Sequence, residues 1–139
     1  MKILDLLTPK RRIGNKGEKI AARALRKKGY KIISKNFVAA DYEIDLIAEN
    51  KTTIAIVEVK TRTKESTPWE PRPASSITPE KQRKIISAAK YYLATRKVNK
   101  RVSLDVVEVY LDERLRKTKV VHIENAFNAN TAYNRKVYY

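Results

Sequence analysis

The chain has 139 residues, of which 42% are hydrophobic and 33% charged, a composition that suits one folded domain. It contains no cysteine, which excludes disulfides, thiolate zinc sites and cysteine nucleophiles and favours a cytoplasmic location. The net charge of +16, from 31 basic and 15 acidic residues, predicts a polyanionic partner, nucleic acid, and no apolar run approaches the ~20 residues of a membrane span.

The first half of the chain predicts a basic arm, one helix and three strands. Residues 1–12 form the expected flexible arm, ahead of a single domain over residues 13–127. A helix is predicted from Asn15 to Lys28, because Asn15 can cap its first turn and Gly29 can end it. Alternating apolar residues then predict strands over residues 30–37, 42–48 and 53–61.

The second half predicts one helix and two strands. Residues 64–76, with three prolines around Trp69, are expected to form an irregular loop. Thr78 and Pro79 have the residue types of an N-cap and a first helical position, so a helix should run to about Lys97. Strands are predicted over residues 101–111 and 119–124, followed by a tail over residues 128–139. The order α-β-β-β-α-β-β indicates an α/β fold, with a mixed five-stranded sheet flanked by helices.

The charge is unevenly distributed along these elements. Residues 1–36 carry 12 basic and 2 acidic side chains and residues 60–139 carry 18 and 8, but residues 37–59 carry one basic and five acidic side chains. The five are Asp41, Glu43, Asp45, Glu49 and Glu58. Carboxylates repel phosphates, so a surface that only binds phosphate has no use for them. A cation held between carboxylates and a phosphate would explain them.

The strands over residues 42–48 and 53–61 are predicted to form a hairpin around the polar stretch Glu49-Asn50-Lys51-Thr52. A two-residue turn makes the numbers of opposing residues sum to 101, and a four-residue loop makes them sum to 103. Either odd sum brings Glu43 and Asp45 to the face of Glu58 and Lys60, and the second places Asp45 directly opposite Glu58. An even sum would break this grouping.

Carboxylates this close need a positive charge between them. Lys60 can supply it, in which case Glu58 and Lys60 form a simple ion pair on the strand. A divalent metal can also supply it, and oxygen ligands without histidine or cysteine favour Mg²⁺ or Mn²⁺. Glu18 has two interpretations as well. It can fold back in a capping box with Asn15, or it can reach the same site from the edge of the apolar helix face.

Several short motifs occur in an order that resembles a known family. They are Gly14-x-x-Gly17-Glu18, Gly29-Tyr30, Asn36, Glu43-Ile44-Asp45-Leu46-Ile47-Ala48, Val57-Glu58-Val59-Lys60-Thr61-Arg62, Lys81, Leu104-Asp105-Val106-Val107 and Asn125-Ala126-Phe127. Together they resemble the YraN-like family of proposed endonucleases, which is similar to archaeal Holliday-junction resolvases and to the wider PD-(D/E)xK nucleases. The resemblance covers about residues 13–127 and implies a restriction-endonuclease-like fold.

The resemblance also implies roles for individual residues. Asp45 and Glu58, with the Val59 carbonyl, would hold Mg²⁺ or Mn²⁺. Lys60 would orient the attacking water or stabilise the developing charge, and Glu18 would reach the metal through water or complete a second site. Lys81 and Arg62 would contact nucleic acid near the site. Arg11 and Arg12 of the predicted arm and Lys16 of the predicted helix are also expected to bind nucleic acid.

The expected function is therefore a metal-dependent endonuclease acting on DNA, including branched or single-stranded DNA. Resolution of a junction needs two coordinated cuts and hence a homodimer. The alternatives are a non-catalytic nucleic-acid-binding module and an adaptor of a DNA-processing assembly, both with the same fold. The loop around Trp69 departs from the family by lacking glycine, and Trp69 could pack over the sheet or stack on an unpaired base. Asp105 and His122 are interpreted as structural strand residues.

Overall fold

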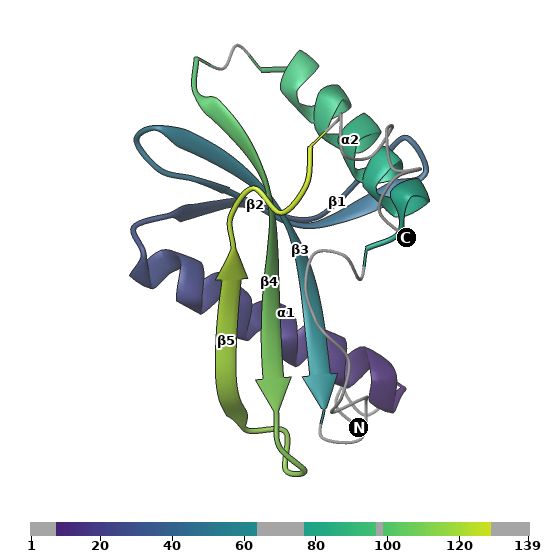
Figure 1. The fold of residues 1–139 in the computed structure, drawn as a ribbon, viewed down its shortest axis with the longest axis vertical. Helices are drawn as coiled ribbons and strands as arrows, with labels where there is room; N and C mark the ends of the chain where they lie inside the picture. Colours follow the sequence, from purple (N-terminus) through teal and green to yellow (C-terminus); the bar gives the residue numbers. More distant parts are fainter. Residues whose placement is uncertain (1–7, 64–76, 97–98, 129–139) are drawn as a thin grey trace, which may run out of the picture.

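One mixed sheet and two helices make up the part of the chain that the computed structural model describes, residues 8–63, 77–96 and 99–128. The strands lie in the order β1-β2-β3-β4-β5 (Figure 1). The elements are α1 (Pro9–Lys27), β1 (Lys31–Ala39), β2 (Tyr42–Glu49), β3 (Thr53–Thr63), α2 (Pro79–Ala94), β4 (Arg101–Leu111) and β5 (Lys117–Ile123). Only β3 and β4 are parallel, and α2 provides the crossover between them. The predicted α/β class, element order and mixed five-stranded sheet are confirmed.

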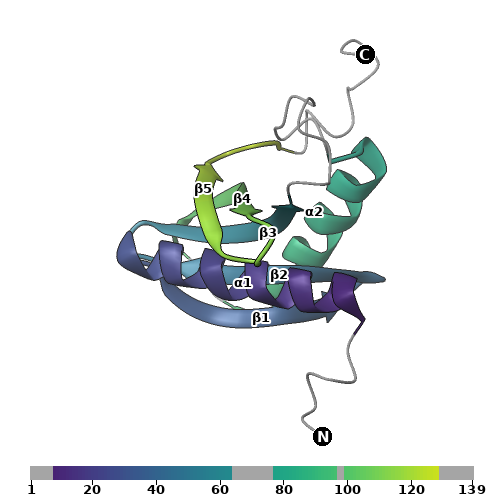
Figure 2. The same cartoon turned by 90° about the horizontal axis from the view of Figure 1, so that it is seen from below.

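The two helices cover opposite faces of the sheet (Figure 2). Ala21, Ala22 and Leu25 of α1 pack against Val57 and Val107 on one face. No other described helix or strand covers the outer face of α1, which has β1 on one flank and β5 on the other in Figure 2.

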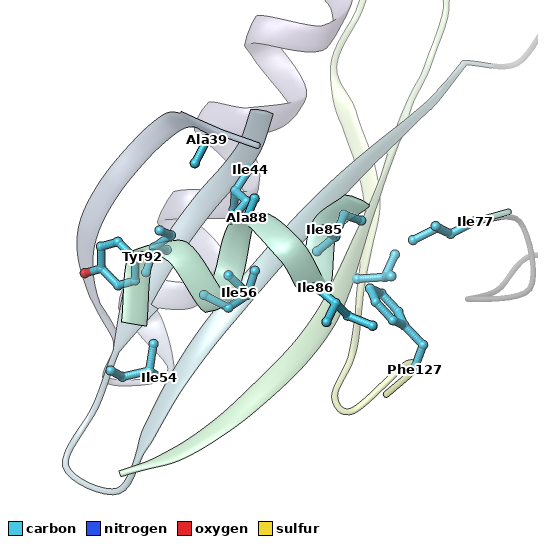
Figure 3. Close-up of a cluster of buried hydrophobic side chains, with 13 residues drawn as sticks. Ala39, Ile44, Ile54, Ile56, Ile77, Ile85, Ile86, Ala88, Tyr92 and Phe127 are labelled. Atoms are coloured by element: carbon cyan, nitrogen blue, oxygen red, sulfur yellow. The ribbon is translucent and has the colours of Figure 1, made fainter. Parts of the chain in front are cut away.

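The second apolar layer lies between α2 and the other face of the sheet (Figure 3). Ile85, Ala88 and Tyr92 of α2 pack against Ile54 and Ile56 of β3. Alternate residues of β3 thus enter opposite layers, as a strand buried on both faces requires. Neither described helix has the length and apolar character needed to span a bilayer.

Helix α1 begins earlier than predicted. Thr8 is its N-cap, with the Thr8 hydroxyl accepting a hydrogen bond from the Arg11 N–H (3.2 Å), and Pro9 occupies the first turn. The predicted start at Asn15 is therefore wrong, and the last four residues of the predicted arm belong to the helix. The Thr-Pro pair that correctly predicted the start of α2 at Thr78 operates here too.

Helix α1 ends at Lys27, within one residue of the predicted end before Gly29. Gly29 has φ +94°, and the N–H groups of Gly29 and Tyr30 return to the carbonyls of Arg26 and Leu25 at 3.0 and 3.1 Å. This is a Schellman motif, which needs a residue in the left-handed region and favours glycine. Helix α2 ends at Ala94, three residues before the prediction. The loop around Trp69, residues 1–7 of the arm and residues 129–139 of the tail lie outside the described residues.

Candidate metal and phosphodiester site

The site begins where β2 separates from β3. Their paired residues sum to 103, the register predicted for a four-residue loop, but the pairing ends at Leu46 and Val57. Ile44 packs in the α2 layer and Leu46 in the α1 layer, although residues two apart share a face in a regular strand. The strand therefore twists at Asp45. Asp45 Oδ2 accepts a hydrogen bond from the Val59 N–H (2.8 Å). The Asp45 side chain thus takes the place of the β2 backbone as the next hydrogen-bond partner of β3.

Glu58 lies on β3 next to this point and is 7% exposed. The Tyr42 hydroxyl is 3.2 Å from both Glu58 carboxylate oxygens, to which it can donate a hydrogen bond. Burial, followed by repulsion from Asp45, raises the pKa of Glu58 to about 7, against the opposing effects of Lys60, Lys81 and the Tyr42 hydroxyl. The carboxyl thus lies in a place where its negative charge is costly unless more positive charge arrives.

Glu18 reaches Asp45 from the other side, on α1. Burial raises the pKa of Glu18 to about 7, and the charge of Asp45 and a hydrogen bond to it act in the same direction. When the Asn36 amide is oriented to satisfy both carboxylates, its nitrogen donates to Glu43 Oε1 (2.8 Å) and Glu18 Oε1 (3.2 Å). The capping-box interpretation of Glu18 is therefore wrong, because Asn15 lies inside the helix and Glu18 faces the sheet.

A close helix–strand contact brings Glu18 within reach. A Cβ atom at Gly17 would lie 1.9 Å from the Thr61 hydroxyl oxygen and 3.0 Å from Thr61 Cβ. Only glycine allows α1 to approach β3 this closely.

One part of the prediction made from the hairpin register is wrong. Tyr42, not Glu43, contacts Glu58, and Tyr42 packs with the α2 layer while the adjacent Glu43 points toward Asn36 and Glu18 on the α1 side. The predicted grouping of Glu43 with Glu58 and Lys60 on one face is wrong because β2 does not remain a regular strand through Asp45. Asp45 itself is affected by Glu18, Glu43 and Lys60, and burial is the largest cause that raises its pKa.

Two lysines approach the carboxylates from β3 and the first turn of α2. Burial lowers the pKa of Lys60, and the nearby Lys81 lowers it further, while Glu58 opposes both. Lys81 and Lys60 each stabilise the charged form of Glu58. Arg62 follows on β3, and its Nε atom is buried without a hydrogen-bond partner among the described residues. The cluster therefore combines four carboxylates with two ammonium groups, which suits a site that handles a phosphate and a cation together.

An open cavity of about 500 Å³ lies on the α1 side of this cluster. Glu18, Glu43 and Asp45 line it, together with Asn36 and Arg11. Of the other basic residues predicted to bind nucleic acid, Arg12 and Lys16 line a different groove on the far side of α1. The structure thus brings Glu18, Asp45, Glu58, Lys60 and Lys81 together and places Arg11 at the cavity mouth, but it separates Arg12 and Lys16 from them.

The carboxylates fit a magnesium site made of few protein ligands. Among residues 8–63, 77–96 and 99–128, no three acidic or histidine side chains are arranged to hold a metal by themselves. Mg²⁺ usually takes one or two carboxylates, keeps several waters and binds substrate phosphate. Asp45 and Glu58 supply oxygen donors of this type, and their raised pKa values show that their negative charge is incompletely compensated.

Tyr42 and the backbone at Asn36 are features of the candidate site that the sequence did not reveal. Asn36 has φ +53° within β1, an arrangement that asparagine tolerates better than most residues. Its place among the family motifs was a signal, but the sequence alone did not show that its amide holds two carboxylates. Tyr42 carried no such signal, because a tyrosine at the start of a strand usually packs.

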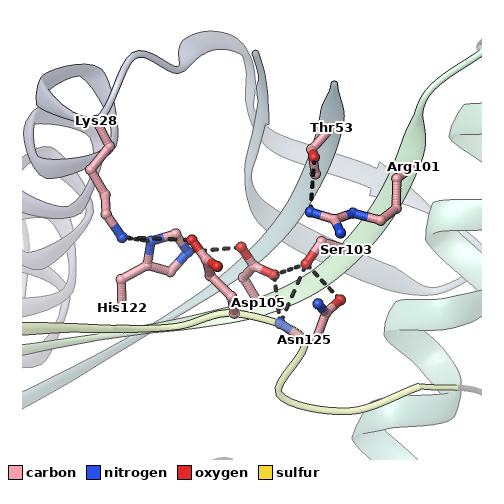
Figure 4. A network of polar contacts seen from close by, with 8 residues as sticks. Lys28, Thr53, Arg101, Ser103, Asp105, His122 and Asn125 are labelled. Carbon is pink, nitrogen blue, oxygen red and sulfur yellow. Dashed lines mark hydrogen bonds and ion pairs between the residues drawn. The ribbon is translucent and has the colours of Figure 1, made fainter. Parts of the chain in front are cut away.

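A second polar network crosses β4 and β5 below the C-terminal end of α1 (Figure 4). Lys28 Nζ donates to His122 Nδ1 (2.7 Å), which leaves His122 Nε2 to donate to Asp105 Oδ2 (2.7 Å). The other Asp105 oxygen accepts from Ser103 and from the Asn125 N–H. Asp105 and His122 are therefore structural, as predicted, and they tie β4 and β5 to the helix.

Comparison with known proteins identifies the family of the chain. Residues 17–109 match the model of the uncharacterised protein family UPF0102. A UPF0102 protein of Caldanaerobacter subterraneus subsp. tengcongensis is 46% identical over 120 residues, covering 85% of this chain and 96% of the relative. The chain belongs to this family. The UPF0102 protein of Desulfosudis oleivorans is 44% identical, over 91% of this chain and 98% of its own length.

Membership of UPF0102 confirms the resemblance to the YraN-like family. The UPF0102 match includes Glu18, Asp45, Glu58, Lys60 and Lys81 and ends in β4 at Val109. The family match and the site geometry therefore concern the same part of the chain.

Proposed function

We propose that the protein is a metal-dependent endonuclease that hydrolyses phosphodiester bonds of DNA. The observation that carries this proposal is the meeting of Asp45 and Glu58 where β2 leaves β3, beside Lys60 and an open cavity. Carboxylates whose pKa values are raised by burial and by each other, beside a lysine, are characteristic of functional sites. The family match and the net charge of +16 support the same function.

Asp45 and Glu58 would hold Mg²⁺ or Mn²⁺, with the Val59 carbonyl as a further ligand. The Val59 N–H fixes the Asp45 carboxylate, and the Tyr42 hydroxyl fixes that of Glu58. When bound, the cation would supply an activated water and neutralise charge on the phosphate.

The remaining groups would act on the substrate. Lys60 would orient the attacking water or donate a hydrogen bond to the phosphoryl oxygen on which negative charge develops. Lys81 and Arg62 would hold the phosphate, and Arg11 would bind the nucleic acid at the cavity mouth. Glu18, hydrogen-bonded to Asp45, would complete the site through water.

The test incubates the purified protein with linear duplex, single-stranded and four-way-junction DNA, in Mg²⁺, in Mn²⁺ and in EDTA. Cleavage of at least one substrate with metal, and none in EDTA, is expected. The Asp45→Ala and Lys60→Ala variants should lose it, whereas the matched surface variant Lys51→Gln should keep it.

Two results would count against the proposal. Binding without cleavage of any substrate would favour the non-catalytic binding module instead. Cleavage that survives both Asp45→Ala and Lys60→Ala would show that the activity comes from other residues or from a contaminant.

A further inference from the structure

A basic groove runs along α1 on the side away from Glu18, between the helix and the turn that joins β4 to β5. It consists of two adjoining cavities of about 360 and 430 Å³ that share Lys16, Ile20 and Arg23. Ile20, Ala24 and Val120 are apolar residues of its lining. The cations along it are Arg12, Lys16, Lys19, Arg23, Lys27, Arg116 and Lys117.

The helix cations of the basic groove are available for a partner. Lys16, Lys19, Arg23 and Lys27 are exposed, and none of them forms an ion pair with another described residue. Arg116 differs, because its Nε lies 2.9 Å from Asp112 Oδ2. Four neighbouring positive charges repel one another in the free protein, so a polyanion would relieve this repulsion.

The spacing of these cations is regular. Steps of three or four residues place Lys16, Lys19, Arg23 and Lys27 in one row along the helix. The row is about 17 Å long, at about 1.5 Å per residue. This equals the axial rise of about five base pairs, at about 3.4 Å per phosphate along one strand. Glu18 lies about 100° to 180° around the helix axis from these four cations, at about 100° per residue.

The lining favours a double strand over a single strand. Proteins that hold single strands combine positive charge with aromatic rings on which the bases stack. The described residues that line the basic groove include no aromatic ring. A straight row of cations on a rigid helix instead matches the regular phosphate backbone of a duplex.

We propose that the basic groove binds the phosphate backbone of a double-stranded nucleic acid. This inference specifies the form of substrate that the proposed nuclease binds, so its biological role rests on the proposed function. The binding itself needs neither metal nor cleavage. The groove and the carboxylate cluster occupy two sides of one helix, so a bound duplex would extend past α1 while another part of the nucleic acid reaches the site.

The experiment measures binding of fluorescent 20-base-pair DNA and RNA duplexes and a single-stranded 20-mer by anisotropy, in EDTA, at several salt concentrations. It compares the native protein with a triple variant, Lys19→Gln, Arg23→Gln and Lys27→Gln. The control variant carries Lys51→Gln, Lys84→Gln and Lys90→Gln, which remove the same charge elsewhere. Glutamine is a good helix former, and circular dichroism melting checks that both variants fold.

The groove variant should bind duplex on the order of tenfold more weakly than the control variant. The slope of log affinity against log salt should fall in magnitude by about three, one for each lost phosphate contact. The two duplexes distinguish DNA from RNA as the source of the backbone. Equal duplex binding by both variants, an unchanged salt slope, or binding of the single strand alone would overturn the inference.

The same experiment separates this inference from the proposed function. Groove-dependent duplex binding by a protein that cleaves nothing would leave the inference standing and remove the nuclease proposal. Cleavage of duplex by the groove variant with an unchanged KM would support the nuclease proposal and overturn the inference about the groove.

Discussion

Glu58 is a buried carboxylate whose neighbours only partly stabilise its charge. Its pKa is raised from 4.5 to about 7, so between these values the folded protein binds a proton that the unfolded chain releases. Stability from this group is therefore fully present below about pH 4.5 and is lost as the pH rises through about 7. A metal ion binds only to ionised carboxylates. In the absence of metal, the site therefore stabilises the fold least at the pH at which it is ready to bind the ion.

The first prediction concerns Glu58→Gln, which keeps the shape of the side chain and removes its charge. We expect the metal-free variant to melt a few degrees above the native protein at pH 8, and the difference to shrink toward pH 5. Thermal melts across this range in EDTA provide the measurement. A difference in Tm that does not change with pH would show that Glu58 titrates as an ordinary surface glutamate.

The second prediction concerns the Tyr42 hydroxyl, which stabilises the ionised form of Glu58. Tyr42→Phe should raise the pKa of Glu58 further, because the charged form loses a donor. If metal binding needs Glu58 ionised, the pH at which cleavage is half-maximal should move upward. A pH profile of the cleavage rate at fixed Mg²⁺ tests this, and an unshifted profile with a lower plateau would assign Tyr42 a packing role alone.

At the scale of elements, α1 is held against β3 at one point of contact. Gly17 lies under Thr61, and this contact sets the distance of Glu18 from Asp45. Gly14, one turn earlier, has no atom within 4 Å of the place where a Cβ would be. The two glycines therefore differ in what they do, although both lie in α1.

The third prediction uses these glycines as a matched pair. Gly17→Ala should destabilise the protein by about 1–3 kcal/mol, because the new methyl group forces α1 away from Thr61, and cleavage should fall with the displacement of Glu18. Gly14→Ala should instead stabilise the helix by about 0.5–1 kcal/mol. Urea denaturation of both variants measures this. Equal effects of the two substitutions would refute the close-contact argument.

The sequence predicted most elements because their signals are local. Period-two patterns, Thr78-Pro79 and Gly29 act within a few residues. The strands, the start of α2 and the end of α1 that they predict agree with the structure. The early start of α1 was missed because Asn15 and Glu18 also have the pattern of a capping box. Glu58 and Asp45 were brought together by register, but the twist at Asp45 depends on contacts with β1 and α1 that a hairpin argument does not contain.

At the scale of the whole molecule, two regions of the fold carry opposite charge. Carboxylates gather where β2 separates from β3, and cations gather on the outer face of α1. A protein with a net charge of +16 attracts a polyanion over its whole surface, while the acidic residues near Asp45 create one local place for a cation.

The fourth prediction is that divalent cations stabilise the whole fold. A ligand that binds only the native state raises its stability by about 2.7 kcal/mol at a concentration of 100 times the Kd. Mg²⁺ or Mn²⁺ should therefore raise the Tm at pH 8, and less at pH 5.5, where protons compete for the carboxylates. Sodium chloride at equal ionic strength is the control, and an equal rise in Tm with sodium chloride would mean that screening alone stabilises the fold.

The central claim is that Asp45 and Glu58 share one divalent cation. The most direct measurement is Mn²⁺ binding, followed by electron paramagnetic resonance of the free ion, for the native protein and for the Asp45→Asn, Glu58→Gln and Lys60→Ala variants. The account predicts one bound ion in the native protein, loss of binding in the two carboxylate variants, and binding retained without Lys60. No bound ion in the native protein, or equal binding by all four proteins, would contradict it.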